Sequence, residues 1–220
     1  MFVGHYGASL AIKSVHQRIP LWVLFIAVQL LDVFWAPLVF LGVERVRIVP
    51  GITASNPLDL YYMPYTHSLV AAVLWSAAAW AAYRLWRRAR TEARAALLVA
   101  LAVFSHWILD FIVHRPDLPL YDDTAKVGLG LWNQPVLAFL LEAGLLLGSM
   151  ALYLRTQRNG RGSLLALGLA MLIIQAFVFF GPTLPSDRAA ALTAFAWYAI
   201  FAGLVWWWER RHASLPRSAA

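Results

Sequence analysis

Residues 95–117 read AALLVALAVFSHWILDFIVHRPD, a stretch whose first ten residues are apolar and whose second half carries two histidines and two aspartates. It has no Lys or Arg before Arg115, and it is long enough to cross roughly 30 Å of hydrocarbon as a helix. Similar apolar blocks recur along the chain, in which 61% of the 220 residues are hydrophobic and 13% are charged. We therefore predict a polytopic membrane protein. It should be all-α, because lipid offers no partner for unpaired backbone groups.

The apolar blocks predict a helical bundle of six spans in a single membrane domain, residues 1–220, with no soluble domain appended. The spans lie at about 21–42, 65–86, 95–114, 131–154, 163–182 and 189–208. The apolar segment before the first span is too short to cross and suits a short re-entrant or interfacial helix. Two longer connections are expected on the outer face. The connection 43–64 has turn residues typical of an irregular cap, and 115–130 has Pro and Gly that forbid a long helix.

The net charge of +7 is unevenly distributed, because thirteen of the 18 basic residues fall on one side of the predicted spans. These are Lys13, Arg18, Arg84, Arg87, Arg88, Arg90, Arg94, Arg155, Arg158, Arg161, Arg210, Arg211 and Arg217. This is the positive-inside pattern. It predicts a membrane protein with both termini in the cytoplasm, partnered by the lipid bilayer and not by nucleic acid. The absence of cysteine excludes disulfides, thiolate nucleophiles and zinc–thiolate sites.

Three of the 11 acidic residues, Asp32, Asp110 and Glu142, fall inside predicted spans. No Lys or Arg lies at a comparable depth to pair with them. An ionised carboxylate near the bilayer centre costs on the order of 3 kcal/mol on insertion scales. The three carboxyl groups are therefore either protonated and hydrogen-bonded to neighbouring helices, or they surround a metal ion.

Histidines accompany these carboxylates: His5, His67, His106 and His114 lie in or beside apolar segments. His106, Asp110 and His114 are spaced i, i+4 and i+8, so they drift by only about 80° around a helix and share one face. The outer two are about 12 Å apart along the axis, which favours two metal ions with Asp110 between them. Imidazole and carboxylate ligands suit zinc, manganese or iron better than calcium.

Other predicted spans supply the remaining polar groups. Asp32 is near the middle of the first span, His67 opens the second, and Glu142 lies half-way along the fourth. Asn133, at the outer end of the fourth span, is a candidate for substrate binding. Because His67 and His114 meet the same face of the membrane, we expect the site in the outer half of the bundle.

Four motifs resemble one family. They are GHYGASL at 4–10, QLLDVFW at 29–35, THS at 66–68 and SHWILDFIVHRPDLPL at 105–120. Over roughly residues 1–145 the chain resembles the YdjM-type inner-membrane proteins, described as membrane-bound metal-dependent hydrolases. The resemblance implies a metal-binding set of His5, Asp32, His67, His106, Asp110 and His114, with Asp117 nearby. The fifth and sixth spans lie outside it, and we expect them to serve packing.

Three functions are compatible with these residues. The first is a metal-dependent hydrolase acting on a phosphoester or similar bond of an amphiphilic or lipid-linked substrate, with Glu142 or Asp117 as general base. The second is a proton- or ion-coupled transporter or channel that uses the intramembrane carboxylates and histidines as a relay, although the chain lacks an evident inverted repeat. The third is a non-catalytic membrane partner with a structural metal site.

Overall fold

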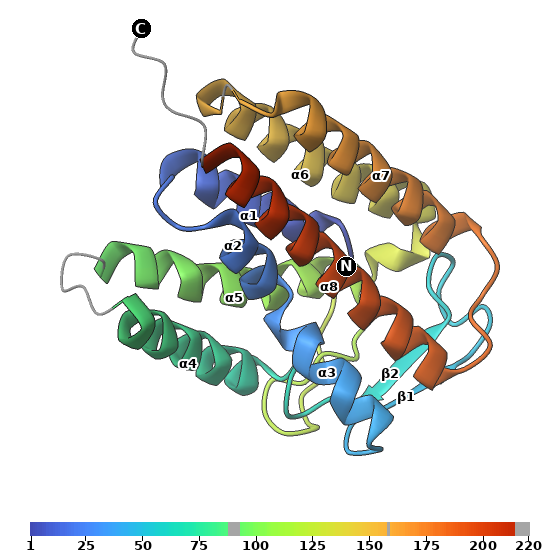
Figure 1. Ribbon diagram of the computed structural model, residues 1–220. Coiled ribbons are helices and arrows are strands. Elements are labelled where there is room, and N and C mark those ends of the chain that lie inside the picture. Colours follow the sequence, from blue (N-terminus) through green and yellow to red (C-terminus); the bar gives the residue numbers. More distant parts are fainter. Residues whose placement is uncertain (88–92, 158, 214–220) are drawn as a thin grey trace, which may run out of the picture.

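A computed structural model describes residues 1–87, 93–157 and 159–213, which form eight α-helices, one turn of 3-10 helix and a β-hairpin (Figure 1). The helices are α1 (Gly4–Val15), α2 (Leu21–Val28), α3 (Leu30–Phe40), α4 (Leu69–Arg87), α5 (Ala93–Val113), α6 (Pro135–Thr156), α7 (Arg161–Phe180) and α8 (Asp187–Ala213). The hairpin pairs β1 (Arg45–Ile48) with β2 (Leu58–Tyr62) in antiparallel order, and the 3-10 turn, η2, covers Leu131–Asn133. The predicted all-α membrane bundle is confirmed. Where the sequence predicts an irregular cap, the chain forms a short hairpin whose register shifts between Arg45 and Arg47.

Five helices, α4 to α8, are long and apolar enough to cross a membrane, and they match five of the predicted spans. The remaining predicted span, 21–42, consists of α2 and α3, which meet at Gln29 with a bend of 52°. Pro37 lies further along, inside α3, so the bend is not at the proline. The described chain therefore has up to six spans, if the bent pair crosses as one.

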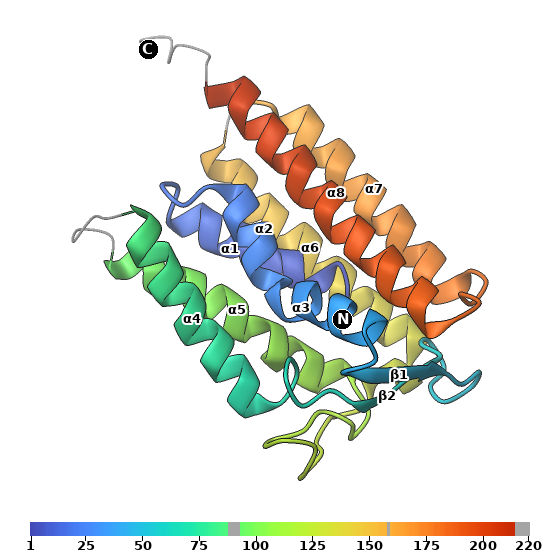
Figure 2. The ribbon, with the colours of Figure 1, turned by 60° about the horizontal axis from the view of Figure 1, so that its bottom comes forward.

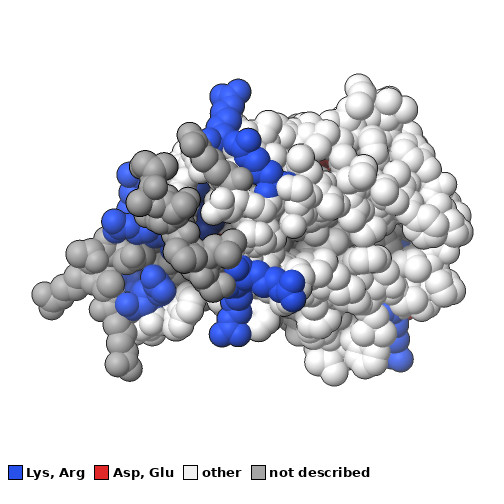
Figure 3. Space-filling view, turned by 45° about the horizontal axis from the view of Figure 1, so that its top comes forward, with Lys and Arg blue, Asp and Glu red and all other residues white. Residues whose placement is uncertain are grey.

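The basic side chains gather at one end of the bundle, as Figure 3 shows for one face. The described members of the predicted basic group are Lys13, Arg18, Arg84, Arg87, Arg94, Arg155, Arg161, Arg210 and Arg211, whereas Arg88, Arg90, Arg158 and Arg217 lie outside the described residues. The opposite end carries the hairpin, the connection 115–130 and the connection 181–186 between α7 and α8 (Figure 2). Each long helix therefore joins an arginine-rich end to an end covered by connections.

Helix α1 lies inside the bundle, where it packs along α6 and also contacts α2 and α5 (Figure 2). Gly7 permits this close approach, because a Cβ atom there would lie 2.7 Å from the carbonyl oxygen of Leu145 on α6. A helix on the membrane surface keeps a polar face in water. The buried position of α1 rules out the interfacial alternative and fits a short inserted helix. Met1 is buried beside Asp110 and not at the arginine-rich end, where the sequence places the N-terminus.

Two acidic side chains from distant helices hold the beginnings of α1 and α2. Glu142 of α6 accepts hydrogen bonds from the backbone N–H groups of Phe2 at 2.8 Å and Gly4 at 3.1 Å. Glu209 of α8 accepts one from the N–H of Leu21 at 2.8 Å. The first N–H groups of a helix have no partner within it, and lipid supplies none. These carboxylates therefore fix where the two short helices start inside the bundle.

Candidate metal centre

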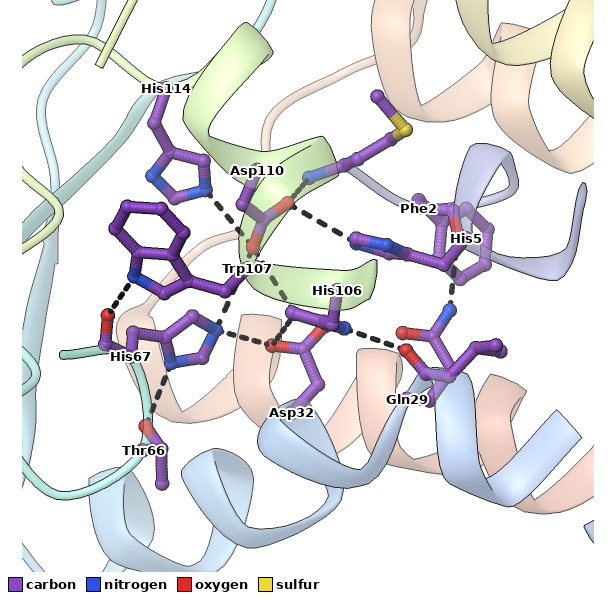
Figure 4. Close-up of polar contacts among 12 residues, drawn as sticks. Phe2, His5, Gln29, Asp32, Thr66, His67, His106, Trp107, Asp110 and His114 are labelled. Carbon is purple, nitrogen blue, oxygen red and sulfur yellow. Dashed lines mark hydrogen bonds and ion pairs between the residues drawn. The ribbon is translucent and has the colours of Figure 1, made fainter. Parts of the chain in front are cut away.

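The carboxylate of Asp110 on α5 lies at the middle of a buried polar cluster (Figure 4). Its Oδ2 atom is 3.1 Å from Nε2 of His106, 3.6 Å from Nε2 of His114 and 3.8 Å from Nε2 of His67. Its Oδ1 atom is 3.2 Å from Nε2 of His5. Helix α5 thus contributes His106 and Asp110, and His114 follows directly after its end. Helix α1 contributes His5, and the segment before α4 contributes His67.

A second carboxylate, Asp32 of α3, extends this cluster. Its Oδ1 atom is 3.2 Å from Nε2 of His67 and 3.8 Å from Nε2 of His106. Its Oδ2 atom accepts a hydrogen bond of 2.6 Å from the hydroxyl of Tyr198 on α8. Tyr198 is not among the predicted site residues, because α8 was expected to serve packing and the hydroxyl of Tyr198 lies alone in the apolar run AFAWYAIF. We call the six residues His5, Asp32, His67, His106, Asp110 and His114 the Asp110 cluster.

Two overlapping groups in this cluster could each hold a metal ion. They are His5, His106 and Asp110, and Asp32, His67 and His106, with the ligand atoms of each group within 4.8 Å of one another. The sequence predicts two metal ions with Asp110 between His106 and His114, and the Nε2 atoms of both histidines lie within 3.6 Å of Oδ2 of Asp110. In the described chain His114 belongs to neither group of three. His5 from α1 and Asp32 from α3 join His106 instead.

Hydrogen bonds at Nδ1 fix the rings of His106 and His114. The Nδ1 atom of His106 lies 2.7 Å from the carbonyl oxygen of Val28, the last residue of α2. Since a carbonyl only accepts, this nitrogen carries the hydrogen. The Nδ1 atom of His114 lies 2.9 Å from a carboxylate oxygen of Asp117 and donates in the same way. Both rings therefore present Nε2 to the cluster.

The ring of His67 is held by hydrogen bonds that run through Thr66 to Glu44, neither of which is among the predicted site residues. Its Nδ1 atom lies 2.7 Å from the hydroxyl oxygen of Thr66, which donates to the Glu44 carboxylate at 2.6 Å. Because the hydroxyl hydrogen points to Glu44, the hydroxyl oxygen accepts from His67. Burial raises the pKa of Glu44, and hydrogen bonds from Thr66 and Tyr65 oppose that shift. This arrangement resembles the outer-shell partners of metal-bound histidines.

These tautomers set the electrostatic character of the cluster. A neutral imidazole that donates from Nδ1 has a lone pair at Nε2, and the Nε2 atoms of His67, His106 and His114 face carboxylate oxygens. Two acceptors do not attract each other, so the arrangement needs a cation, which is either a proton or a metal ion. Ligand atoms about 2.1 Å from a tetrahedral zinc ion lie roughly 3.4 Å apart. The nitrogen–oxygen separations of 3.1 to 3.8 Å are of this size.

Glu142 lies beside this cluster and is buried. Its Oε2 atom accepts from Phe2 and Gly4, while its Oε1 atom has no hydrogen-bond partner in the described structure. The amino group of Met1 donates to Oδ1 of Asp110 at 2.5 Å, which brings one positive charge to the cluster. In the described structure, Asp32 and Asp110 form ion pairs with histidine rings and with this amino group.

Two other predicted site residues, Asp117 and Asn133, lie outside the group of side chains around Asp110. Asp117 is behind the ring of His114, where it also pairs with Nε of Arg115 at 3.3 Å. Asn133 is exposed, because the turn of η2 directs it outward and its neighbour Trp132 inward. The ring of Trp132 lies 4.2 Å from that of His114. Trp132 lines the cavity described next, whereas Asp117 and Asn133 do not.

The polar cluster forms one wall of a cavity of about 740 Å³. Its polar lining consists chiefly of Asp32, His67, Asp110, His114, Glu142 and Tyr198. The remaining walls come from α7, α8 and the loop of the hairpin, and they are mostly apolar. The cluster is therefore buried on the bundle side and faces this cavity on the other.

Comparison of the chain with protein-family models, curated proteins and solved structures finds no match. The class of this protein is therefore described from its fold and its candidate site alone. The chain is an all-α membrane protein of five or six spans. It contains a buried cluster of histidines and aspartates that could hold a metal ion.

Proposed function

We propose that this chain is a membrane-embedded, metal-dependent hydrolase that cleaves a phosphoester or similar bond of an amphiphilic or lipid-linked substrate. The observation that carries the proposal is that the Asp110 cluster faces a cavity. Structural zinc sites are closed by protein ligands, whereas catalytic sites keep one position open. Asp32, His67 and Asp110 belong to the candidate metal groups and also line the cavity, so an ion held by them would face a bound substrate.

The ring geometry supports a metal ion over a set of protonated histidines. The rings of His5 and His106 are stacked, with centroids 3.8 Å apart and an angle of 6° between their planes. Two positively charged rings at this distance would repel each other. A shared divalent ion, either zinc, manganese or iron, would satisfy their Nε2 atoms and the two aspartates without that repulsion.

Side chains around the cluster have two roles in this proposal, which are to accept a proton and to hold the metal ligands in place. When bound, a divalent ion would supply Lewis acidity and an activated water molecule. Glu142 is the group best placed to accept a proton, because two N–H groups fix one of its oxygens and leave Oε1 unpartnered at the cavity. Tyr198 holds Asp32 in place, and the Thr66 hydroxyl holds His67.

Asp117 is better explained as a positioning residue than as a general base. Its carboxylate accepts from Nδ1 of His114 and pairs with Arg115, so both of its oxygens are engaged outside the cavity. A carboxylate behind a histidine ring orients the ring and makes its Nε2 a stronger donor of electrons.

The resemblance to the YdjM-type proteins supports the same proposal, because all six residues that it implies meet in the Asp110 cluster. We also infer that the arginine-rich end faces the cytoplasm of a bacterial inner membrane. In that orientation the cluster lies toward the outer leaflet, because His114 is next to the end of α5 that carries the connections.

The two alternative functions receive less support. A proton relay across the membrane needs polar groups between the cluster and the arginine-rich end. Between His5 and Lys13, however, α1 buries Tyr6 and Leu10 in the apolar core, and the buried hydroxyl of Ser9 donates to the backbone carbonyl oxygen of Tyr6. A purely structural metal site would not need the adjoining cavity.

Glu142→Gln tests the assignment of the base. Glutamine keeps an oxygen that can accept from Phe2 and Gly4, so the start of α1 and the metal content should be retained. Turnover of a panel of alkyl phosphomonoesters and phosphodiesters should fall by at least 100-fold, since a general base contributes about 10²–10⁴-fold. Asp122→Asn, an exposed carboxyl in the connection after α5, is the matched control. Metal-loaded wild type that cleaves no member of the panel but takes up protons into proteoliposomes would overturn the hydrolase proposal.

A further inference from the structure

The apolar walls of the cavity come mainly from two neighbouring helices that pack against different partners. Helix α7 packs on α6, whereas α8 packs on α2 and α3. The side chains that they direct to the cavity are Ile173, Ile174, Phe177 and Val178 on α7, and Ala190, Thr193, Ala194 and Trp197 on α8. The space between the two helices is therefore continuous with the space that the Asp110 cluster faces.

The cavity opens along α7. Ile173 and Phe177 line it, yet 62% and 63% of their surfaces are exposed. Residues with both properties lie at the rim of an opening, and this rim lies within a predicted span, where the surroundings are hydrocarbon. The connection 181–184 and the hairpin loop also line the cavity, and Ala54, Thr183 and Leu184 there are exposed as well. These two connections lie at the end of the bundle opposite the arginines (Figure 2). The opening therefore extends from that end along the side of the bundle, where α7 faces hydrocarbon.

We propose that this chamber between α7 and α8 binds the hydrocarbon chain of the substrate, and that the substrate enters from the bilayer between these two helices. The inference rests on the proposed function only in placing the head group at the Asp110 cluster. A volume of about 740 Å³ is within the range of roughly 300–1,000 Å³ of pockets that enclose whole small ligands. The polar wall takes the head group, and the apolar walls exclude any occupant that is polar along its whole length.

The test measures binding and does not depend on turnover. An alkyl phosphate with a photoreactive group at the end of its chain is cross-linked to the full-length protein in nanodiscs, and the modified peptides are mapped by mass spectrometry. Straight-chain alkyl phosphates from two to eight carbons, all monomeric in solution, compete with the probe. Burial of each CH₂ group is worth about a fourfold gain in affinity. We expect cross-links in α7 and α8, and competitor affinity that rises about fourfold per carbon until the chamber is full.

A matched pair of variants separates the chamber from the bilayer. Ala194→Phe places a large side chain in the chamber, and Ala199→Phe places the same side chain on an exposed position of α8. In Ala194→Phe the chamber loses room for two CH₂ groups. The affinity for the longest competitor should fall about 15-fold, and the affinity for the two-carbon competitor should not change. Ala199→Phe should bind both like wild type.

The outcomes distinguish the two proposals. If competitor affinity rises with alkyl length equally in wild type and both variants, or if cross-links are spread over the outer surface, the alkyl phosphates partition into lipid. Either result would overturn the proposal that the chamber binds the hydrocarbon chain. Hydrolysis of short-chain esters without chain-length dependence would overturn the chamber while retaining the hydrolase. Binding as expected, with no hydrolysis, would retain the chamber and overturn the proposed function.

Discussion

Replacing Asp110 by asparagine should remove most of the bound metal. Asp110 faces four imidazole Nε2 atoms within 3.1 to 3.8 Å, whereas Asp32 faces two. Asparagine retains the shape of the side chain and deletes its charge, so the variant tests electrostatics and not packing. We expect a larger loss for Asp110→Asn than for Asp32→Asn.

The expected loss of folding stability in Asp110→Asn follows from mass action. At a free metal concentration of 100 times the dissociation constant, binding to the folded state alone stabilises it by about 2.7 kcal/mol. Loss of an outer-shell partner typically weakens metal binding about 10- to 100-fold, and we take about 100-fold as the least effect for a central ligand. About 0.4 kcal/mol of the stabilisation then remains, so about 2.3 kcal/mol is lost. For a chain of this length, that corresponds to a fall in Tm of about 5–9 °C.

The assay combines elemental analysis of the purified protein with thermal unfolding in nanodiscs, each with and without chelator. Chelator should lower the Tm of wild type toward that of Asp110→Asn and should leave the variant unchanged. This comparison also separates metal loss from loss of the contact between Asp110 and the amino group of Met1. Asp122→Asn, which removes an exposed carboxylate, should behave like wild type. An Asp110→Asn protein with full metal content and a wild-type, chelator-insensitive Tm would refute the assignment of the cluster to a metal ion.

Three further predictions follow from the structure. Reporter fusions after Gln157 should report the cytoplasm and fusions at Asp122 the periplasm, and the reverse pattern would place the cluster toward the inner leaflet. Thr66→Val removes the hydroxyl that holds His67 and should weaken metal affinity about 10- to 100-fold in competition with a metal indicator; unchanged affinity would mean that this hydroxyl does not orient the ring. Tyr198→Phe leaves a buried carboxylate oxygen without its partner and should lower the free energy of unfolding by about 1–3 kcal/mol. A denaturation curve identical to that of wild type would contradict that assignment.

The spans could be predicted from the sequence because membrane insertion depends on local length and hydropathy. The bend at Gln29 could not, because it has no proline or glycine signal. It is instead accompanied by tertiary contacts, in which the side-chain amide of Gln29 donates to the carbonyl oxygen of Phe2 and His106 donates to that of Val28. The inserted position of α1 depends in the same way on its fit against α6.

For the candidate site too, local helix geometry could be predicted from the sequence, whereas contacts between helices could not. The i, i+4, i+8 spacing of His106, Asp110 and His114 predicts one shared face, because helix geometry alone determines it. Which residues of other helices complete a group of three ligands depends on tertiary packing, so the spacing along α5 could not show that His5 and Asp32 would both join His106. Thr66 and Tyr198 were missed because a single hydroxyl gains meaning only from the residue that it contacts.

The place of α1 in the bundle has a consequence for biosynthesis. This helix is made before its main partner α6, which ends at Thr156, so the nascent chain must grow from Val15 to Thr156 before α1 can be buried. At about 5–20 residues per second, that interval lasts roughly 7–28 s. During it His5 has neither its helix partner nor Glu142 to hold the start of α1. The Asp110 cluster is therefore completed late, after most spans have entered the bilayer, and a ribosome-bound chain that stops before α6 would lack it.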